Sequence, residues 1–250
     1  MPQLMRSSNP TLSDRTFRGL PYAFGETMTL EGTVNKTGIL LLCAMATAAW
    51  TWHLFMQAKS PAAVMGLFWV GTIGGFIFAL ITSFKMAWAP VTAPIYALLE
   101  GLALGGISAI FEVRFPGIPM EAVCLTFGTL LVLLLLYRSR IIKVTQRFRL
   151  GVVAATGAIF LFYLVEMVLG FFHISFGAVN GSGPIGIGIS LIIVGVAALN
   201  LILDFDFIER GAASGAPKYM EWYGGFALMV TLVWLYLEML RLLTKLQRRD

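Results

Sequence analysis

The feature that most constrains this chain is a series of apolar stretches, each about 20 residues long. A helix rises about 1.5 Å per residue, so such a stretch crosses the roughly 30 Å hydrocarbon core of a bilayer. The expected spans are residues 37–57, 63–84, 93–111, 118–137, 152–172, 184–205 and 222–240. The sequence therefore predicts an all-α membrane protein built as a seven-transmembrane-helix bundle.

Composition supports the same class. Hydrophobic residues make up 58% of the chain and charged residues 12%, whereas a soluble domain carries roughly 25% charged residues. Cys43 and Cys124 both lie in apolar runs, so we expect small hydrophobic side chains with neither a disulfide nor a metal role. No soluble catalytic domain is expected.

Three parts are expected along the chain. Residues 1–36 form a polar N-terminal arm with no early apolar segment of the kind that marks a cleaved signal peptide. Residues 37–244 form the membrane domain, and residues 245–250 form a basic tail. Within the membrane domain, Gly101 and Gly105, together with Gly71, Gly74 and Gly75, predict close helix crossings.

Basic residues orient the spans. The loop at 138–149 carries five Lys or Arg residues and no acid, which predicts a cytoplasmic position. The chain is therefore expected to be a multi-pass protein of a cell inner membrane, with its N-terminus in the cytoplasm. The tail, with Arg241, Lys245, Arg248 and Arg249, would then lie outside. The alternative is that one segment is re-entrant and only six segments cross.

The chain lacks the signatures of an enzyme. His53 and His173 lie far apart, and there is no HExxH, GxSxG or phosphate-binding loop motif. Each histidine is expected to be an interfacial polar residue. The basic loop could contact anionic membrane lipids, and no nucleic-acid partner is expected.

Acids within or bordering the spans are the informative feature. Charge at the bilayer centre costs about 2.5–3.5 kcal/mol on insertion scales, so such residues usually face the protein interior. They are Glu100, Glu166, Glu238, Asp204, Asp206 and Glu209, with Asn200 nearby. Because no Lys or Arg lies mid-span beside them, we expect these acids to be protonated or to hold a cation.

Helix rise places the acids at three levels. Asp204 and Asp206 lie at the cytoplasmic end, Glu100 and Asn200 roughly 10 Å in from the cytoplasmic side, and Glu166 and Glu238 at roughly 20–25 Å. A cation or proton path would need such levels. The alternative is a set of isolated protonated acids bonded to helix backbones, and the pattern alone leaves both open.

Four segments carry a resemblance to a known family: MRSSNPTL at 5–12, MTLEGTVNKTG at 28–38, APIYALLEGLALGGIS at 93–108 and LILDFDFIERG at 201–211. Together they resemble the Bax inhibitor family in its bacterial YccA-like branch. The resemblance implies seven helices with the last near the centre, and a proton-sensitive leak of calcium gated by two aspartates. The first aspartate matches Asp206. The place of the second falls at Thr231, where Asp204, Glu221 or Glu238 could substitute.

The leading expectation is therefore a pH-sensitive leak for calcium or another cation, with no resident cofactor. Calcium prefers 6–8 oxygen ligands, so any bound Ca²⁺ would be weakly held and partly hydrated. Asp204 and Asp206 point about 200° apart on a helix, while Asp206 and Glu209 share a face. We expect Asp206 to be the gate acid. The alternative is a non-transporting regulator, for example a modulator of a membrane protease.

Overall fold

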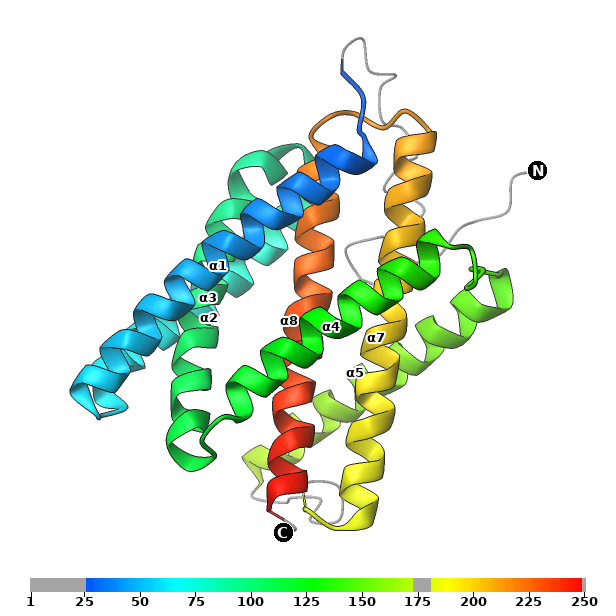
Figure 1. Cartoon of the computed structure of the whole chain (residues 1–250). Coiled ribbons are helices and arrows are strands. Elements are labelled where there is room, and N and C mark those ends of the chain that lie inside the picture. The colour runs from blue at the N-terminus through cyan, green and yellow to red at the C-terminus, as the bar shows by residue number, and fades with distance from the viewer. Residues whose placement is uncertain (1–25, 173–180, 249–250) are drawn as a thin grey trace. The chain divides into compact units, whose positions relative to one another are not determined.

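The computed structural model describes residues 26–172 and 181–248, and the elements of this part are helices (Figure 1). The helices are α1 (Leu30–Ala58), α2 (Ala62–Phe84), the short 3₁₀ turn η2 (Met86–Trp88), α3 (Ala89–Arg114), α4 (Ile118–Arg138), α5 (Gln146–Phe171), α7 (Pro184–Ala213) and α8 (Met220–Gln247). The expectations for residues 1–25, which include the arm motif at 5–12, and for His173 lie outside the described residues.

The seven predicted spans are confirmed as helices. Each long helix in the described ranges has 21 to 30 residues and is apolar enough to cross a membrane. Several run beyond their expected ends. The side chain of Thr29 accepts a hydrogen bond from the Gly32 amide and starts α1 at Leu30, and Thr145 caps α5 in the same way through Phe148. Helix α1 therefore includes the last part of the expected arm, and α8, which ends at Gln247, includes the start of the expected tail.

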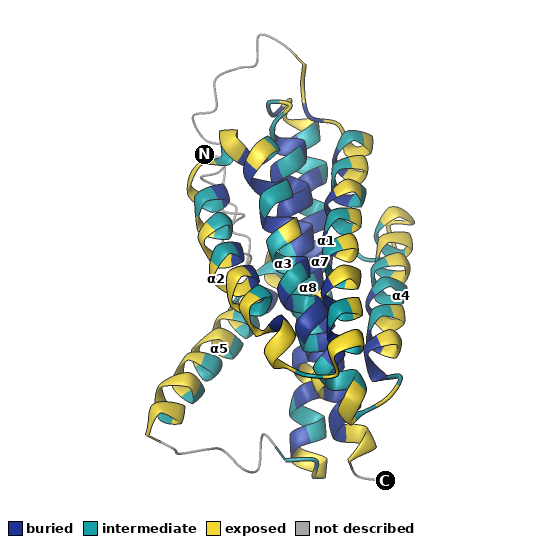
Figure 2. Cartoon of the chain, turned by 90° about the vertical axis from the view of Figure 1, so that its left-hand side faces the viewer, coloured by how far each residue is buried: buried dark blue, intermediate teal, exposed yellow. Residues whose placement is uncertain are grey.

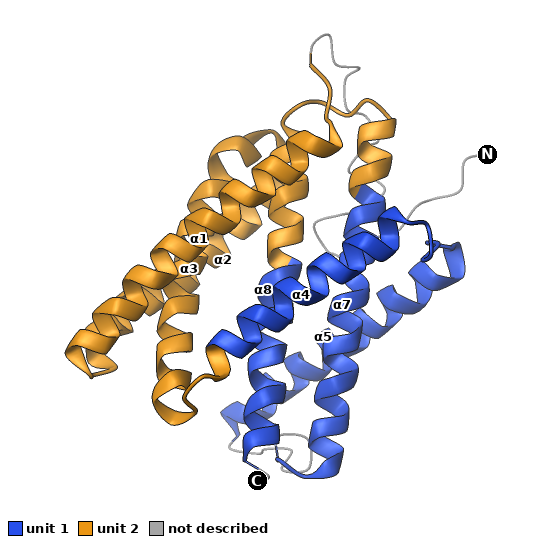
Figure 3. Ribbon diagram, in the orientation of Figure 1, with its two compact units in different colours: residues 1–14, 120–207, 231–250 blue, residues 15–119, 208–230 orange. Residues whose placement is uncertain are grey.

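The chain divides into two compact units (Figure 3). Unit 2 comprises residues 15–119 and 208–230, and unit 1 comprises residues 1–14, 120–207 and 231–250. Helices α7 and α8 each contribute to both units. The last helix is also the most buried, since 61% of its most apolar window is buried, against 6% for α5 (Figure 2). That burial agrees with the central position expected for the last helix.

In unit 2, α3 packs against both α1 and α2. The predicted close crossings are confirmed here. A methyl group added at Gly101 would overlap with Ala44 and Thr47 of α1, and one at Gly105 would overlap with Ala48. Glycine at these positions allows the backbones of α1 and α3 to approach, which matters where lipid provides no hydrophobic force between helices.

Unit 1 consists of most of α4, all of α5, the first part of α7 and the second half of α8. Leu201, Leu235 and Leu240 are fully or almost fully buried in its core. Polar side chains are buried with them, among them Asn200 and Asp204 of α7 and Glu238 of α8. Unit 1 therefore holds most of the acids that the sequence marked as candidates.

Candidate functional site

Polar side chains on three helices of unit 1 bond to one another from one end of the helices toward the other. We call this set the polar seam. Its members are Arg149, Thr156 and Tyr163 on α5, Ser190, Asn200, Asp204 and Asp206 on α7, and Thr231, Glu238, Arg241 and Lys245 on α8.

The first contact of the seam joins the start of α5 to α7. A terminal guanidinium nitrogen of Arg149 donates to Asp206 at 2.8 Å, and the two side chains are only 11% and 16% exposed. The Nε atom of Arg149 is also buried, and it has no hydrogen-bond partner among the described residues. The ion pair therefore uses one side of the guanidinium fork, which is weaker than a bidentate arginine–carboxylate pair.

The second contact joins α7 to α8. The hydroxyl of Thr231 donates to the Asp204 carboxylate at 2.6 Å, and both residues are buried. Asp204 and Asp206 thus meet different helices, as the roughly 200° between their directions on α7 predicts. The structure brings Thr231, the expected place of the second aspartate, to Asp204.

The third contact lies at Asn200. Its amide nitrogen donates to the Thr156 hydroxyl of α5 at 2.8 Å and to the backbone carbonyl of Val196 at 2.8 Å. Asn200 is 3% exposed. An amide that is buried in a membrane helix needs such partners, because no water is available to satisfy its donors.

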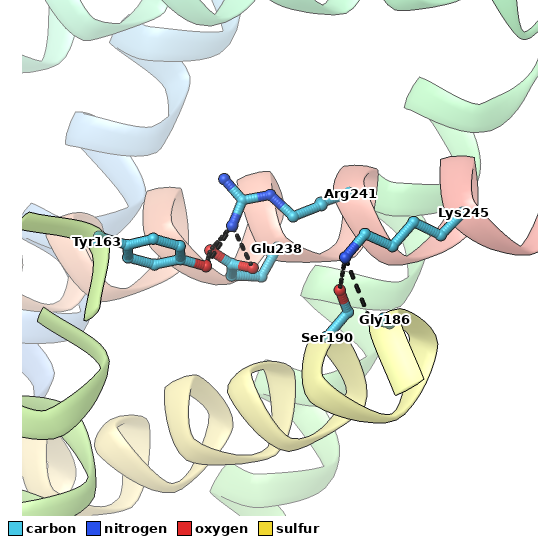
Figure 4. Close-up of polar contacts among 6 residues, drawn as sticks. All are labelled: Tyr163, Gly186, Ser190, Glu238, Arg241 and Lys245. Atoms are coloured by element: carbon cyan, nitrogen blue, oxygen red, sulfur yellow. Dashed lines mark hydrogen bonds and ion pairs between the residues drawn. The ribbon is translucent and has the colours of Figure 1, made fainter. Parts of the chain in front are cut away.

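The remaining contacts gather around α8 (Figure 4). Glu238 is buried, accepts a 2.7 Å hydrogen bond from the Tyr163 hydroxyl and pairs with Arg241 at 3.1 Å. Arg241 also contacts the Tyr163 hydroxyl. One turn further, the ammonium of Lys245 donates to Ser190 at 2.9 Å and to the Gly186 carbonyl at 3.1 Å. Glu238 is therefore a partnered interior residue and not a side chain that reaches out to water at the helix end.

On α5 and α8, most members of the seam recur at a spacing of seven residues. On α5 they are Arg149, Thr156 and Tyr163, and on α8 they are Thr231, Glu238 and Lys245. Residues seven apart lie two helical turns apart on nearly the same face. From residue 231 to 245, the seam covers about 21 Å along α8 at 1.5 Å per residue. This is most of the hydrocarbon thickness of a bilayer.

Three predicted site residues are not members of the polar seam. Glu209 follows Asp206 by one turn on α7, and Glu166 follows Tyr163 by one turn on α5 and interacts electrostatically with Lys245. Glu100 belongs to unit 2, where its carboxylate lies against Gly75 of α2. The prediction that Glu100 and Asn200 form one level of a path stays a prediction.

The expectation that the acids lack basic partners is wrong for two of them. Asp206 pairs with Arg149, and Glu238 pairs with Arg241. The sequence predicts that Arg149 lies in the connecting loop, but α5 begins at Gln146, so this arginine occupies the first turn of the helix. Its side chain is long enough to reach the end of α7 from there. The seven-residue spacing of Arg149, Thr156 and Tyr163 could have indicated this in the sequence.

Metal ligands are not concentrated anywhere in the described ranges. No group of three or more His, Cys, Asp or Glu side chains that could hold a metal ion occurs within residues 26–172 and 181–248. Cys43 and Cys124 are free thiols. A cation in the seam would therefore meet oxygen atoms of mixed type, namely carboxylates, hydroxyls, an amide and backbone carbonyls.

Comparison with known proteins identifies the family. A model of the family described as "Bax inhibitor 1 like" matches residues 9–248, which is nearly the whole chain. No curated protein matches, and no solved structure matches. The family is generally one of non-enzymatic membrane proteins, in line with the absence of catalytic motifs. With seven long apolar helices and this match, the chain is a multi-pass membrane protein that belongs to the Bax inhibitor 1-like family.

Proposed function

We propose that this protein is a pH-sensitive leak pathway for calcium or another cation, in the YccA-like branch of its family. The observation that carries the proposal is the polar seam of α5, α7 and α8, which covers about 21 Å of the membrane thickness. Polar and ionisable side chains are expensive inside a membrane, and they usually mark ion or proton paths.

The chemistry of the seam suits the passage of a cation. The carboxylates of Asp206, Asp204 and Glu238 and the amide of Asn200 supply oxygen atoms at successive depths along α7 and α8. Arg149 and Arg241 balance two of the carboxylates in the structure. A passing cation would compete with these arginines for the carboxylates, which would make the site weak and transit fast. Calcium would keep part of its hydration shell there.

The gate that we propose is the contact region of Asp204 and Asp206. The Asp206 carboxylate must be ionised to hold Arg149, so protonation would release the start of α5 from α7. The partial pairing of Arg149, with Nε unsatisfied, favours a contact that can open. Glu209, one turn from Asp206, adds a second acid on that side of α7 and would respond to the same protons.

We place Glu166, Glu238 and Glu100 along the proposed cation path. Glu166 and Glu238 lie near Lys245 and Arg241, where the charges of both signs would shape cation entry. Glu100 belongs to unit 2, where its carboxylate lies against Gly75 of α2, and it would take part in the path there. The proposal assigns the protein to a cell inner membrane with its N-terminus in the cytoplasm, based on the basic loop after α4.

The experiment is calcium flux through purified protein in liposomes, measured with an enclosed fluorescent indicator. Wild-type protein should pass calcium well above protein-free liposomes. Asn200→Leu, which replaces the buried amide with an apolar side chain of similar size, should reduce the flux severalfold. A matched control is Thr129→Val on α4, outside the seam. If wild-type protein passes no cation, the non-transporting regulator, for example of a membrane protease, becomes the better account.

A further inference from the structure

A short segment ahead of α1 is bound to the connection between α7 and α8, within unit 2. We call this segment, residues 26–29, the strap. Thr27 forms an isolated antiparallel bridge with Pro217, and the amide of Met28 donates to the carbonyl of Ala216 at 2.7 Å. Glu26 lies 3.7 Å from the ammonium of Lys218. The strap therefore lies against the α7–α8 loop over consecutive residues.

Glu221, in the first turn of α8, holds the end of the strap. One carboxylate oxygen, Oε1, accepts from the Thr29 amide at 2.9 Å and from the Thr29 hydroxyl at 2.8 Å, and it pairs with Lys218 at 3.2 Å. The other oxygen, Oε2, is buried and has no hydrogen-bond partner among the described residues. The residue is fully buried, although it lies at a helix end. Three donors therefore converge on one oxygen of a buried carboxylate, and against the effect of burial, the hydrogen bonds from Thr29 and the charge of Lys218 lower the pKa of Glu221.

Glycine at position 32 makes room for the carboxylate. A methyl group built on Gly32 would overlap with the carboxyl group of Glu221. The same Thr29 hydroxyl that donates to Glu221 accepts from the Gly32 amide, so the N-terminal cap of α1 and the strap share one hydrogen-bond chain. Disturbing Glu221 would therefore disturb the start of α1 as well.

The loop that the strap covers joins two helices of the proposed gate. Asp204 lies on α7, which ends at Ala213, and Thr231 lies on α8, which begins at Met220. Their 2.6 Å hydrogen bond requires a fixed axial register between the two helices. A strap that pins the turn between them would help to keep that register.

We propose that Glu221 is the latch of a regulatory strap. The latched strap holds the α7–α8 loop and keeps the gate closed, and its release lets α7 and α8 shift and increases the leak. The control of the gate rests on the function proposed above, whereas the latch itself does not.

The test uses two glycines of α1. Gly32→Ala displaces the Glu221 carboxylate, while Gly38→Ala is the matched control because no atom lies within 4 Å of a methyl group built there. Both changes favour the helix similarly. Glu221→Gln and Glu31→Gln form a second pair, in which Glu31 is an exposed acid of the first turn of α1. The reporter is the cysteine pair Thr27→Cys and Pro217→Cys in a Cys43→Ser, Cys124→Ser background.

Bridged residues of antiparallel chains have Cα atoms about 4.5–5.5 Å apart, which suits a disulfide. We expect rapid disulfide formation in the reporter and in both control variants, and severalfold slower formation with Gly32→Ala and Glu221→Gln. In liposomes, Gly32→Ala should raise calcium flux severalfold, and the oxidised reporter should pass less than its reduced form.

Unchanged disulfide formation in Gly32→Ala and Glu221→Gln would overturn the latch. Slower formation with unchanged flux would overturn its control of the gate. If wild-type protein shows no flux at all, the proposed function fails and gate control falls with it, while the disulfide rates still decide whether Glu221 holds the strap.

Discussion

The hydroxyl of Thr231 donates a 2.6 Å hydrogen bond to the carboxylate of Asp204, and both residues are buried in unit 1. The family resemblance places the second of two gating aspartates at Thr231. The structure therefore brings that position into direct contact with an acid of α7, although a hydroxyl stands where the resemblance implies a carboxylate. Asp206, two residues further, is engaged by Arg149 from α5. Thr231 and Arg149 thus contact the two aspartates of α7 from different helices.

Replacing the hydroxyl by a carboxylate should change how the protein responds to pH. In Thr231→Asp, two carboxyl groups would lie within hydrogen-bond distance and could not both ionise cheaply, so they would share a proton. We expect the pH profile of calcium flux in liposomes to gain a further titration step. Thr231→Asn, which has the same shape without the charge, should not show it. An identical profile for both variants would mean that position 231 lies outside the gate.

Removing the Thr231 hydroxyl should destabilise the protein. Thr231→Val takes one donor away from the buried Asp204 carboxylate, and we expect a loss of about 1–2 kcal/mol in unfolding free energy. Thr126→Val is the matched control, because the buried hydroxyl of Thr126 donates to a carbonyl of its own helix, that of Ala122. Thermal unfolding in detergent measures both. Equal losses in the two variants would contradict a specific role for the Asp204 contact.

The ion pair between Arg149 and Asp206 should be measurable as a coupling energy. Arg149→Gln and Asp206→Asn each remove one charge, and the double variant removes both. We expect the double variant to be more stable than the sum of the single losses predicts, with a coupling of about 0.5–3 kcal/mol. Strict additivity of the three unfolding free energies would show that the pair contributes nothing to stability.

The sequence was sufficient for the helices but not for their partners. Runs of about 20 apolar residues locate all seven spans, since length and hydrophobicity decide membrane crossing. The caps at Thr29 and Thr145 extend α1 and α5 beyond the apolar runs, and hydropathy does not register them. Likewise, hydropathy predicts that Arg149 is a charged loop residue, whereas α5 begins before it, at Gln146. Which acid meets which base depends on helix packing, and no local pattern encodes that.

The contacts of Glu221 could not be predicted from the sequence either. In the sequence it is one of three substitutes for a missing gate aspartate, on the basis of its residue type and its place near the last span. The structure shows it bonded to Thr29, 192 residues away. Such a contact depends on the close approach that Gly32 permits, and a glycine in a first helical turn has no distinctive signal of its own.

Orientation can be tested by labelling. In a background without Cys43 and Cys124, a cysteine at Ser139 should resist a membrane-impermeant thiol reagent in intact cells, because the basic loop after α4 is expected to be cytoplasmic. A cysteine at Ser60, between α1 and α2, should react, since one span separates it from the cytoplasmic N-terminus. The reverse pattern would invert the topology and the assignment of the Asp206 end to the cytoplasm.

We propose that protonation of Asp206 controls a cation pathway. The most direct measurement is calcium flux through purified protein in liposomes across a range of pH, with Asp206→Asn compared with the wild type and with Glu121→Gln, an exposed acid at the start of α4. We predict that flux depends on pH in the wild type and in Glu121→Gln and becomes nearly independent of pH in Asp206→Asn. A flux in Asp206→Asn that follows pH as the wild type does would contradict the account and leave Asp206 as a structural ion-pair partner of Arg149.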